Sequence, residues 1–184
     1  MNLTSRTARR LAVGTALACA SLLVPAAIAL AAPATSARPA APAKPATPAC
    51  ETPGLVEWMD TQGSGAAGSV FYTLEFTNLS GHACTLNGFP YLYAVGLSGH
   101  QIGHIATFNH TPPPHQITIG NGKTATAQLQ IVDVGNFPTS ACHPVTAAGL
   151  KIFPPNQTRS KTVPFPFRAC SSGSPVFLTV GAVR

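Results

Sequence analysis

The stretch SVFYTLEFT, residues 69–77, decides the fold class of this chain. Every second residue from Val70 to Phe76 is apolar, and polar residues such as Thr73 and Glu75 stand between them. Side chains alternate between the two faces of a β-strand, so this period of two predicts a strand with one buried face. Residues 123–133 repeat the pattern, with Ala, Leu and Ile on one face and Thr and Gln on the other.

Shorter segments extend the β-rich prediction along the chain. Weaker strand candidates are residues 55–59, 91–97, 101–107, 116–119, 150–153, 161–167 and 176–183. Beyond residue 31, no segment keeps the 3.6-residue period of an amphipathic helix. Many short strands separated by turn residues predict an all-β fold. We expect an antiparallel β-sandwich of immunoglobulin-like topology, with a barrel as the alternative.

The first 31 residues have the layout of a secretory signal peptide. Three arginines, the last of them Arg10, precede an Ala-rich apolar run that ends in the small-residue motif Ala29-Leu30-Ala31. This order of basic, apolar and small residues is typical of a cleaved export signal. Two alternatives stay open, lipid attachment at Cys19 and a retained signal anchor. We predict an extracytoplasmic protein, either secreted or held in the cell envelope.

An Ala- and Pro-rich segment follows at residues 32–49. It is too poor in large apolar residues to offset the entropy of ordering the chain, so we predict a disordered linker. Such a spacer would hold a domain away from a membrane or thread it through a cell wall. A disordered tail with no function would have the same composition. The remaining residues, 50–184, have the length of one domain.

The formal net charge of +6 does not fall on the predicted domain. Three cationic residues lie in the leader, and two more, Arg38 and Lys44, lie in the linker. Residues 50–184 therefore hold six Lys and Arg against five Asp and Glu, a net charge of +1. Proteins that follow phosphate backbones concentrate Lys and Arg on one face. The sequence predicts no nucleic-acid partner, no cofactor and, after signal cleavage, no membrane span.

Cysteine usage fits the oxidising compartment that export implies. Four cysteines remain once Cys19 leaves with the signal, and four allow three pairings. If residues 55–77 form a hairpin, Cys50 and Cys84 fall almost opposite each other, and a hairpin of residues 150–167 does the same for Cys142 and Cys170. We therefore predict the disulfides Cys50–Cys84 and Cys142–Cys170, with no free thiol in the domain.

Several short segments resemble a known family. These are GAAG at 65–68, FTN at 76–78 and CTLNGFP at 84–90, and they are similar to the exported actinobacterial domain of unknown function family 4232. The similarity covers most of residues 50–184, including FPP at 153–155 and Cys170 before the last strand. The resemblance implies a secreted or envelope-anchored β-sandwich. It brings no established activity and no catalytic residues.

Two patterns that suggest small-molecule chemistry have simpler interpretations. Gly63, Gly65 and Gly68 match the spacing of a dinucleotide-binding loop, but a strand follows them instead of a helix, so we predict a hairpin turn. Four histidines crowd one stretch without the short fixed spacing of a zinc site, so we predict loop residues and not metal ligands. These weak metal candidates are His100, His104, His110 and His115.

Catalytic groups are scarce. Ser98 has a nearby histidine, His100, but it lacks the nucleophile elbow and the helix that should follow it. A hydrolase would also need an acid such as Asp133 or Glu75 in the same pocket. We predict a non-catalytic protein, with an extracellular hydrolase as one alternative and a metal-binding protein as another.

The aromatic residues are the remaining candidates for function. Alternation places Tyr91 and Tyr93 on one face of a strand, where they would form a flat platform for a ligand. We therefore expect a module that binds a partner protein or a wall polymer. The sequence leaves the oligomeric state open.

Overall fold

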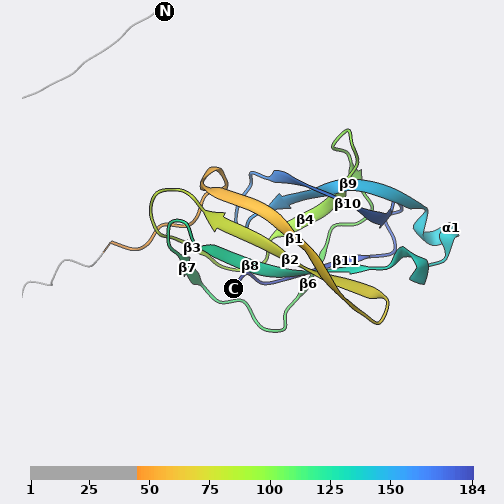
Figure 1. Ribbon diagram of the computed structural model, residues 1–184, viewed down its shortest axis with the longest axis horizontal. Coiled ribbons are helices and arrows are strands. Elements are labelled where there is room, and N and C mark those ends of the chain that lie inside the picture. The colour runs from red at the N-terminus through yellow and green to blue at the C-terminus, as the bar shows by residue number, and fades with distance from the viewer. Residues whose placement is uncertain (1–44) are drawn as a thin grey trace, which may run out of the picture. The chain divides into compact units, whose positions relative to one another are not determined.

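The computed structural model describes residues 45–184, which form two β-sheets packed face to face (Figure 1). The predicted signal peptide and the linker as far as residue 44 lie outside the described residues. The end of that linker already pairs with the domain, because Ala49 bridges Thr85 and the Thr85 amide donates to the Pro48 carbonyl at 2.8 Å. None of the helices in residues 45–184 has the length and apolar character that a membrane span requires.

The larger sheet has five strands in the spatial order β1-β2-β8-β11-β6. All neighbouring pairs are antiparallel except β6 and β11, which run parallel. The strands are β1 (Leu55–Ala66), β2 (Ser69–Asn78), β6 (Thr107–Asn109), β8 (Thr124–Val132) and β11 (Leu178–Gly181).

The smaller sheet has four antiparallel strands in the order β10-β9-β4-β5. A separate two-stranded ribbon joins β3 to β7, and short helices fill three connections. The strands are β4 (Tyr91–Val95), β5 (Gln101–Ile102), β9 (Pro144–Phe153), β10 (Lys161–Cys170), β3 (Cys84–Leu86) and β7 (Ile117–Ile119); the helices are η1 (Thr52–Gly54), η2 (Val134–Asn136) and α1 (Thr139–Cys142).

The core lies between the two sheets and follows the alternation in the sequence. On β2, Leu74 and Phe76 are fully buried, and on β8 so is Leu129. The facing sheet contributes Leu150 and Ile152 of β9, which are equally buried. Burying side chains of this size stabilises the fold by about 1.5–3 kcal/mol each. The predictions of an all-β fold and of the two clear strands are confirmed, while the immunoglobulin-like topology stays a prediction.

The strand predictions fail where the chain changes sheets. Residues 101–107 were expected to form one strand, but the chain leaves the smaller sheet after Ile102 and joins the larger sheet at Thr107. Gly103 stands at the break with a φ of +65°, a left-handed conformation that glycine adopts without strain. A period of two cannot reveal such a crossing, because both halves are extended.

The prolines of β10 identify it as an edge strand. Pro164 and Pro166 lie in the strand and are exposed, and the register with β9 shifts between Pro164 and Phe167. Proline has no N–H to donate, so within sheets it is confined to edges and bulges. These residues also block the pairing of a further strand at this edge.

Both predicted disulfides are present. Cys50 is bonded to Cys84 and Cys142 to Cys170, and all four residues are buried. The hairpin argument holds because Leu55 lies opposite Asn78, which places the two cysteines just beyond the end of the β1–β2 ladder. The β9–β10 ladder likewise ends where Cys170 pairs with Pro144.

Candidate functional site

The outer face of the four-stranded sheet carries the two tyrosines that the sequence singled out. Leu92 and Ala94 of β4 point into the core and are fully buried. Tyr91 and Tyr93 therefore share the opposite face, and Tyr91 is 38% exposed. Their ring centroids lie 6.1 Å apart, so the structure does bring them together.

A third ring completes the group. Phe153 of β9 is the cross-strand partner of Tyr91, and its ring lies 5.5 Å from that of Tyr91 and 6.3 Å from that of Tyr93. We call Tyr91, Tyr93 and Phe153 the Tyr91 cluster. The sequence prediction missed Phe153 as a partner because only the β4–β9 register reveals which residue lies opposite Tyr91.

The Tyr91 cluster is not the flat platform that the sequence predicted. The ring planes of Tyr91 and Tyr93 meet at 81°, and those of Tyr91 and Phe153 at 75°. In this edge-to-face arrangement the positive edge of one ring lies against the negative face of the next, which is a favourable contact. The three rings therefore do not form one broad plane on which a sugar ring would stack.

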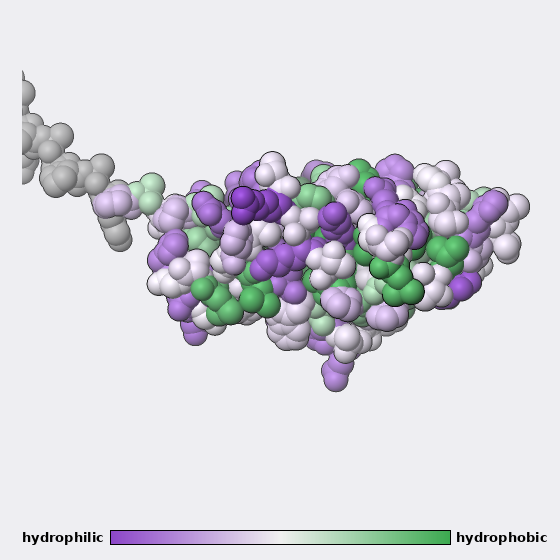
Figure 2. Space-filling model, turned by 90° about the horizontal axis from the view of Figure 1, so that it is seen from above, coloured by the Kyte–Doolittle hydropathy of each residue, from purple (hydrophilic) through white to green (hydrophobic). Residues whose placement is uncertain are grey.

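A groove of about 500 Å³ lies further along β4, beyond Tyr93, and none of the three rings lines it. Val95, two residues beyond Tyr93, lines one wall, and Thr162 and Pro164 of β10 line another. Leu97 stands in the loop between β4 and β5, lines the groove and is 99% exposed. Lys151, which lies between Tyr93 and Thr162 in register, supplies a positive charge beside the cluster. Figure 2, which looks down on the side where β9 and β10 lie uppermost in Figure 1, shows apolar side chains in separate patches among polar ones.

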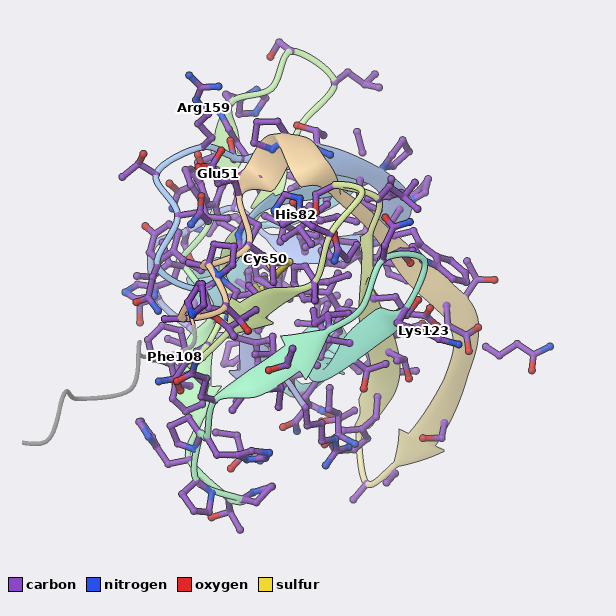
Figure 3. The ribbon with its side chains drawn as sticks, turned by 90° about the vertical axis from the view of Figure 1, so that its left-hand side faces the viewer. Cys50, Glu51, His82, Phe108, Lys123 and Arg159 are labelled. Atoms are coloured by element: carbon purple, nitrogen blue, oxygen red, sulfur yellow. A yellow bond between two sulfur atoms is a disulfide. The ribbon has the colours of Figure 1, made fainter. Side chains whose placement is uncertain are left out.

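A second aromatic group lies at another edge. Phe89 stacks on Phe108 with centroids 4.8 Å apart and planes at 20°, and His110 packs against the Phe89 ring at 4.8 Å. Figure 3, which looks at the end of the domain where Cys50 lies, shows Phe108 on the left, across the picture from Lys123. The mutual stacking of these rings explains their position without a ligand.

The four histidine candidates have different surroundings. His100 bonds to Ser98, His104 bonds to the Ile105 carbonyl at 2.8 Å, His110 packs on Phe89 and His115 is exposed. Within residues 45–184, no group of three or more His, Cys, Asp or Glu side chains is placed to hold a metal ion. The Gly-rich stretch forms the β1–β2 hairpin, as predicted, with its turn at Ala67 and Gly68.

Ser98 and His100 form a local pair in a pocket of about 550 Å³. The serine Oγ lies 2.7 Å from the imidazole Nδ1, and the ring rests on Gly96, where a Cβ would lie 2.3 Å from its Cε1. Neither acid named by the hydrolase hypothesis lines this pocket. Asp133 lines a different pocket, and Glu75 lies opposite Trp58 in the five-stranded sheet.

A polar pocket of about 480 Å³ lies where the chain enters the domain. Glu51 and Arg159 both line it, and Figure 3 shows these two side chains close together near Cys50. The sequence prediction missed this pocket because its lining comes from segments more than 100 residues apart, which no local pattern connects.

Glu57 is the one buried acid among the described residues, and sequence reasoning missed it. It occupies an inward position of β1 between Leu55 and Met59, is 8% exposed, and neither carboxyl oxygen has a hydrogen-bond partner. Burial raises the pKa of Glu57 to about 7, against an opposing effect of the Lys161 charge. Lys161 reaches across from β10 and donates to the Leu55 carbonyl. The sequence did carry a signal for this: in Leu-Val-Glu-Trp-Met, residues 55–59, strand alternation puts Glu57 on the same face as two apolar residues.

Comparison with known proteins gives one family. No curated protein and no solved structure matches this chain. A family model described as "Domain of unknown function (DUF4232)" matches residues 50–184, which run from the first disulfide cysteine to the last residue of the chain. The chain therefore belongs to the DUF4232 family.

Proposed function

We propose that this domain is a non-catalytic, extracytoplasmic binding module that docks a partner protein on the outer face of its four-stranded sheet. The observation that carries the proposal is the Tyr91 cluster, in which three rings from two strands gather beside a groove of about 500 Å³. Tyrosine and phenylalanine are enriched at the centres of protein interfaces, where charged residues are depleted.

The geometry favours a protein over a polysaccharide. Ring planes that meet at 75–81° give no single flat surface on which a sugar ring would stack, whereas the side chains of a partner protein pack against ring edges as well as ring faces. Val95, Leu97 and Pro164 give the adjoining groove apolar walls, and Leu97 is almost fully exposed. A partner segment that covers Leu97 would remove from water an apolar side chain that the isolated domain leaves there.

Location supports the same proposal. Two buried disulfides are typical of proteins that fold in an oxidising compartment. The predicted signal peptide would deliver the chain there, and the Ala- and Pro-rich linker would give the domain reach within the envelope.

The hydrolase and metal alternatives receive no comparable support. Ser98 and His100 are hydrogen bonded, but Asp133 and Glu75 do not join them in their pocket. The four candidate histidines lie in separate surroundings. A partner protein therefore stays the leading interpretation.

Binding to isolated cell envelopes tests the proposal. We expect Tyr91→Ala/Tyr93→Ala to weaken retention of the purified protein at least about tenfold, because truncated aromatic anchors each cost on the order of 1–2 kcal/mol or more. Trp58→Ala is the matched control, since Trp58 is 45% exposed and lies in the other sheet. It should bind as the parent protein does.

Pretreatment of the envelopes identifies the class of partner. Digestion with a protease should abolish retention, whereas digestion of the wall polymer should release bound protein only together with its partner. Retention that survives the protease and disappears with the polymer would replace the protein partner by a wall polymer. Equal retention of the double variant and the parent would overturn the assignment of this face.

A further inference from the structure

The small net charge of the domain hides a separation of its charges along the chain. Residues 50–122 contain no Lys or Arg, and residues 134–184 contain no Asp or Glu. The acids that lie in strands, Glu57, Asp60 and Glu75, all belong to β1 and β2 of the larger sheet. In the smaller sheet, β9, β10 and the loop between them carry cations alone, namely Lys151, Arg159, Lys161 and Arg168.

Two of these four cations have an acid of the domain nearby. Arg159 and Glu51 line the polar pocket where the chain enters the domain, and their side chains lie close together (Figure 3). Lys161 donates to the Leu55 carbonyl of β1, and its charge acts on the buried Glu57. These two charges are therefore balanced within the domain.

The other two cations, Lys151 and Arg168, lie on the outer face of the four-stranded sheet. Lys151 is the cross-strand partner of Tyr93 and shares its face. Arg168 alternates with Phe167, whose ring packs on the buried Phe177, so the exposed Arg168 points away from the core. The four strands of this sheet contain no Asp or Glu, and neither do the loops from β4 to β5 and from β9 to β10. This face is therefore positively charged.

The groove of about 500 Å³ lies between the two cations. Ala148 of β9 lines the groove, and along the strand it stands between Lys151 and Thr146. Thr146 is the cross-strand partner of Arg168. Between Thr146 and Lys151 the strand covers about 16 Å, at roughly 3.3 Å per residue. A groove with apolar walls thus has one positive charge toward each end.

We infer that the partner protein of this face presents an apolar side chain flanked on both sides by carboxylates. The inference rests on the proposed function and names the chemistry of the partner. The apolar side chain would fill the groove, and the carboxylates would meet Lys151 and Arg168. A guanidinium binds a carboxylate through two parallel hydrogen bonds, and complementary charges favour the correct partner over others. In an extended partner segment the two acids would stand about five residues apart.

The same two cations do not suit a polyanion. Segments that bind anionic lipid headgroups use clusters of about four to eight Lys and Arg. Proteins that follow a chain of phosphates likewise concentrate cations on one face. This face offers two cations separated by a groove, which fits discrete carboxylates on a protein segment.

Retention on isolated cell envelopes tests the inference with a pair of charge substitutions. Lys151→Gln/Arg168→Gln should weaken retention at least about fivefold at low salt, because both charge-assisted contacts are lost. Lys123→Gln/Arg184→Gln is the matched control, since it removes the same charge from two exposed residues beside β8 in the other sheet. It should be retained as the parent protein is. Raising the salt concentration from about 0.05 M to about 0.5 M should weaken retention of the parent more than that of the charge variant, because salt screens the lost contacts.

Chemical capping of the envelopes identifies the anion. Carbodiimide with glycinamide converts accessible carboxylates to neutral amides and leaves phosphodiesters unchanged. Parent protein added to washed, capped envelopes should be retained as weakly as the charge variant is on untreated ones. Full retention on capped envelopes, together with loss of retention by the charge variant, would indicate phosphate groups and would overturn the inference.

The same assay separates this inference from the proposed function. If Tyr91→Ala/Tyr93→Ala loses retention while the charge variant behaves as its control does, the docking face stands and the acidic partner segment is wrong. If neither pair of substitutions changes retention, the docking face is wrong and this inference falls with it.

Discussion

Glu57 is a carboxyl group whose surroundings oppose its charge. It faces the core from β1, lacks hydrogen-bond partners and has Lys161 as the charged group nearby. Burial raises the pKa of Glu57 from 4.5 to about 7, so the folded domain binds the proton more tightly than the unfolded chain does. The resulting stabilisation is fully present below about pH 4.5 and is lost as the pH rises through about 7.

This linkage makes a prediction about Glu57→Gln. At pH 5 the folded protein holds Glu57 neutral, as Gln would be, and only the unfolded Glu57 is partly ionised, so the two free energies of unfolding should differ by less than about 1 kcal/mol. At pH 8 the variant should be more stable than the parent by about 2 kcal/mol, a value reduced from the full shift to allow for water that reaches the carboxyl. Urea unfolding at both pH values measures this difference.

Lys161→Met provides the complementary test. Because the Lys161 charge lowers the pKa of Glu57, its removal should enlarge the loss of stability between pH 5 and pH 8. A Glu57→Gln protein whose stability depends on pH as the parent's does would show that Glu57 does not titrate in this range. Any effect of Lys161→Met on the pH dependence would then have to come from a group other than Glu57.

At the scale of strands, two glycines make a matched pair. Gly149 of β9 lies against the neighbouring strand, where an added Cβ would stand 2.3 Å from the Val163 carbonyl oxygen and 3.1 Å from the Pro164 Cα. Gly65 of β1 has nothing within 4 Å of its Cβ position. Neither has the positive φ that only glycine tolerates well, so the difference between them is one of space.

We predict that Gly149→Ala lowers the free energy of unfolding by about 1–3 kcal/mol, the usual cost of forcing extra volume into a packed site. Gly65→Ala should leave stability unchanged or raise it by up to about 1 kcal/mol, because alanine restricts the unfolded chain. Thermal and urea unfolding of the two variants side by side measure both effects. Equal stability of the two variants would contradict the close approach of β9 and β10 at Gly149.

The strands show how far periodicity predicts this fold. Residues 69–77 and 123–133 were predicted because apolar and polar residues alternate in them, and the structure confirms both strands: β8 buries every second residue along its length, and β2 does so from Leu74 onward. Residues 101–107 were wrongly predicted as one strand because the crossing at Gly103 changes the sheet and not the extended backbone. The register of β4 with β9 places Phe153 opposite Tyr91, and the sequence does not reveal that register, so the contact between the two rings could not be predicted.

Long-range position explains the rest of the candidate site. The cysteine pairs were predictable because each lies beside a hairpin, where sequence distance fixes spatial distance. The shared face of Tyr91 and Tyr93 was predictable from alternation, but the angle between their rings was not, since packing against Phe153 sets it. The pocket that Asp133 lines takes its other residues from β2, β8, η2 and β10, which no local pattern relates.

At the scale of the whole molecule, the two sheets present different outer surfaces. The four-stranded sheet carries the Tyr91 cluster, its groove and Lys151, whereas the five-stranded sheet carries Trp58 beside Glu75. If the partner binds only the outer surface of the four-stranded sheet, a crosslinking probe on that sheet should capture the partner, and the same probe on the five-stranded sheet should not. Tyr91 and Trp58 are both exposed aromatic residues, one on each sheet, and they allow that comparison within one fold.

The most direct measurement of the central claim is photo-crosslinking in intact cells, with a light-activated amino acid placed at Tyr91 or at Trp58. We predict that the probe at Tyr91 yields a discrete, protease-sensitive adduct larger than the domain, and that the probe at Trp58 yields none. Identical adduct patterns from both positions, or crosslinking from Trp58 alone, would contradict the claim that the four-stranded sheet docks a partner protein.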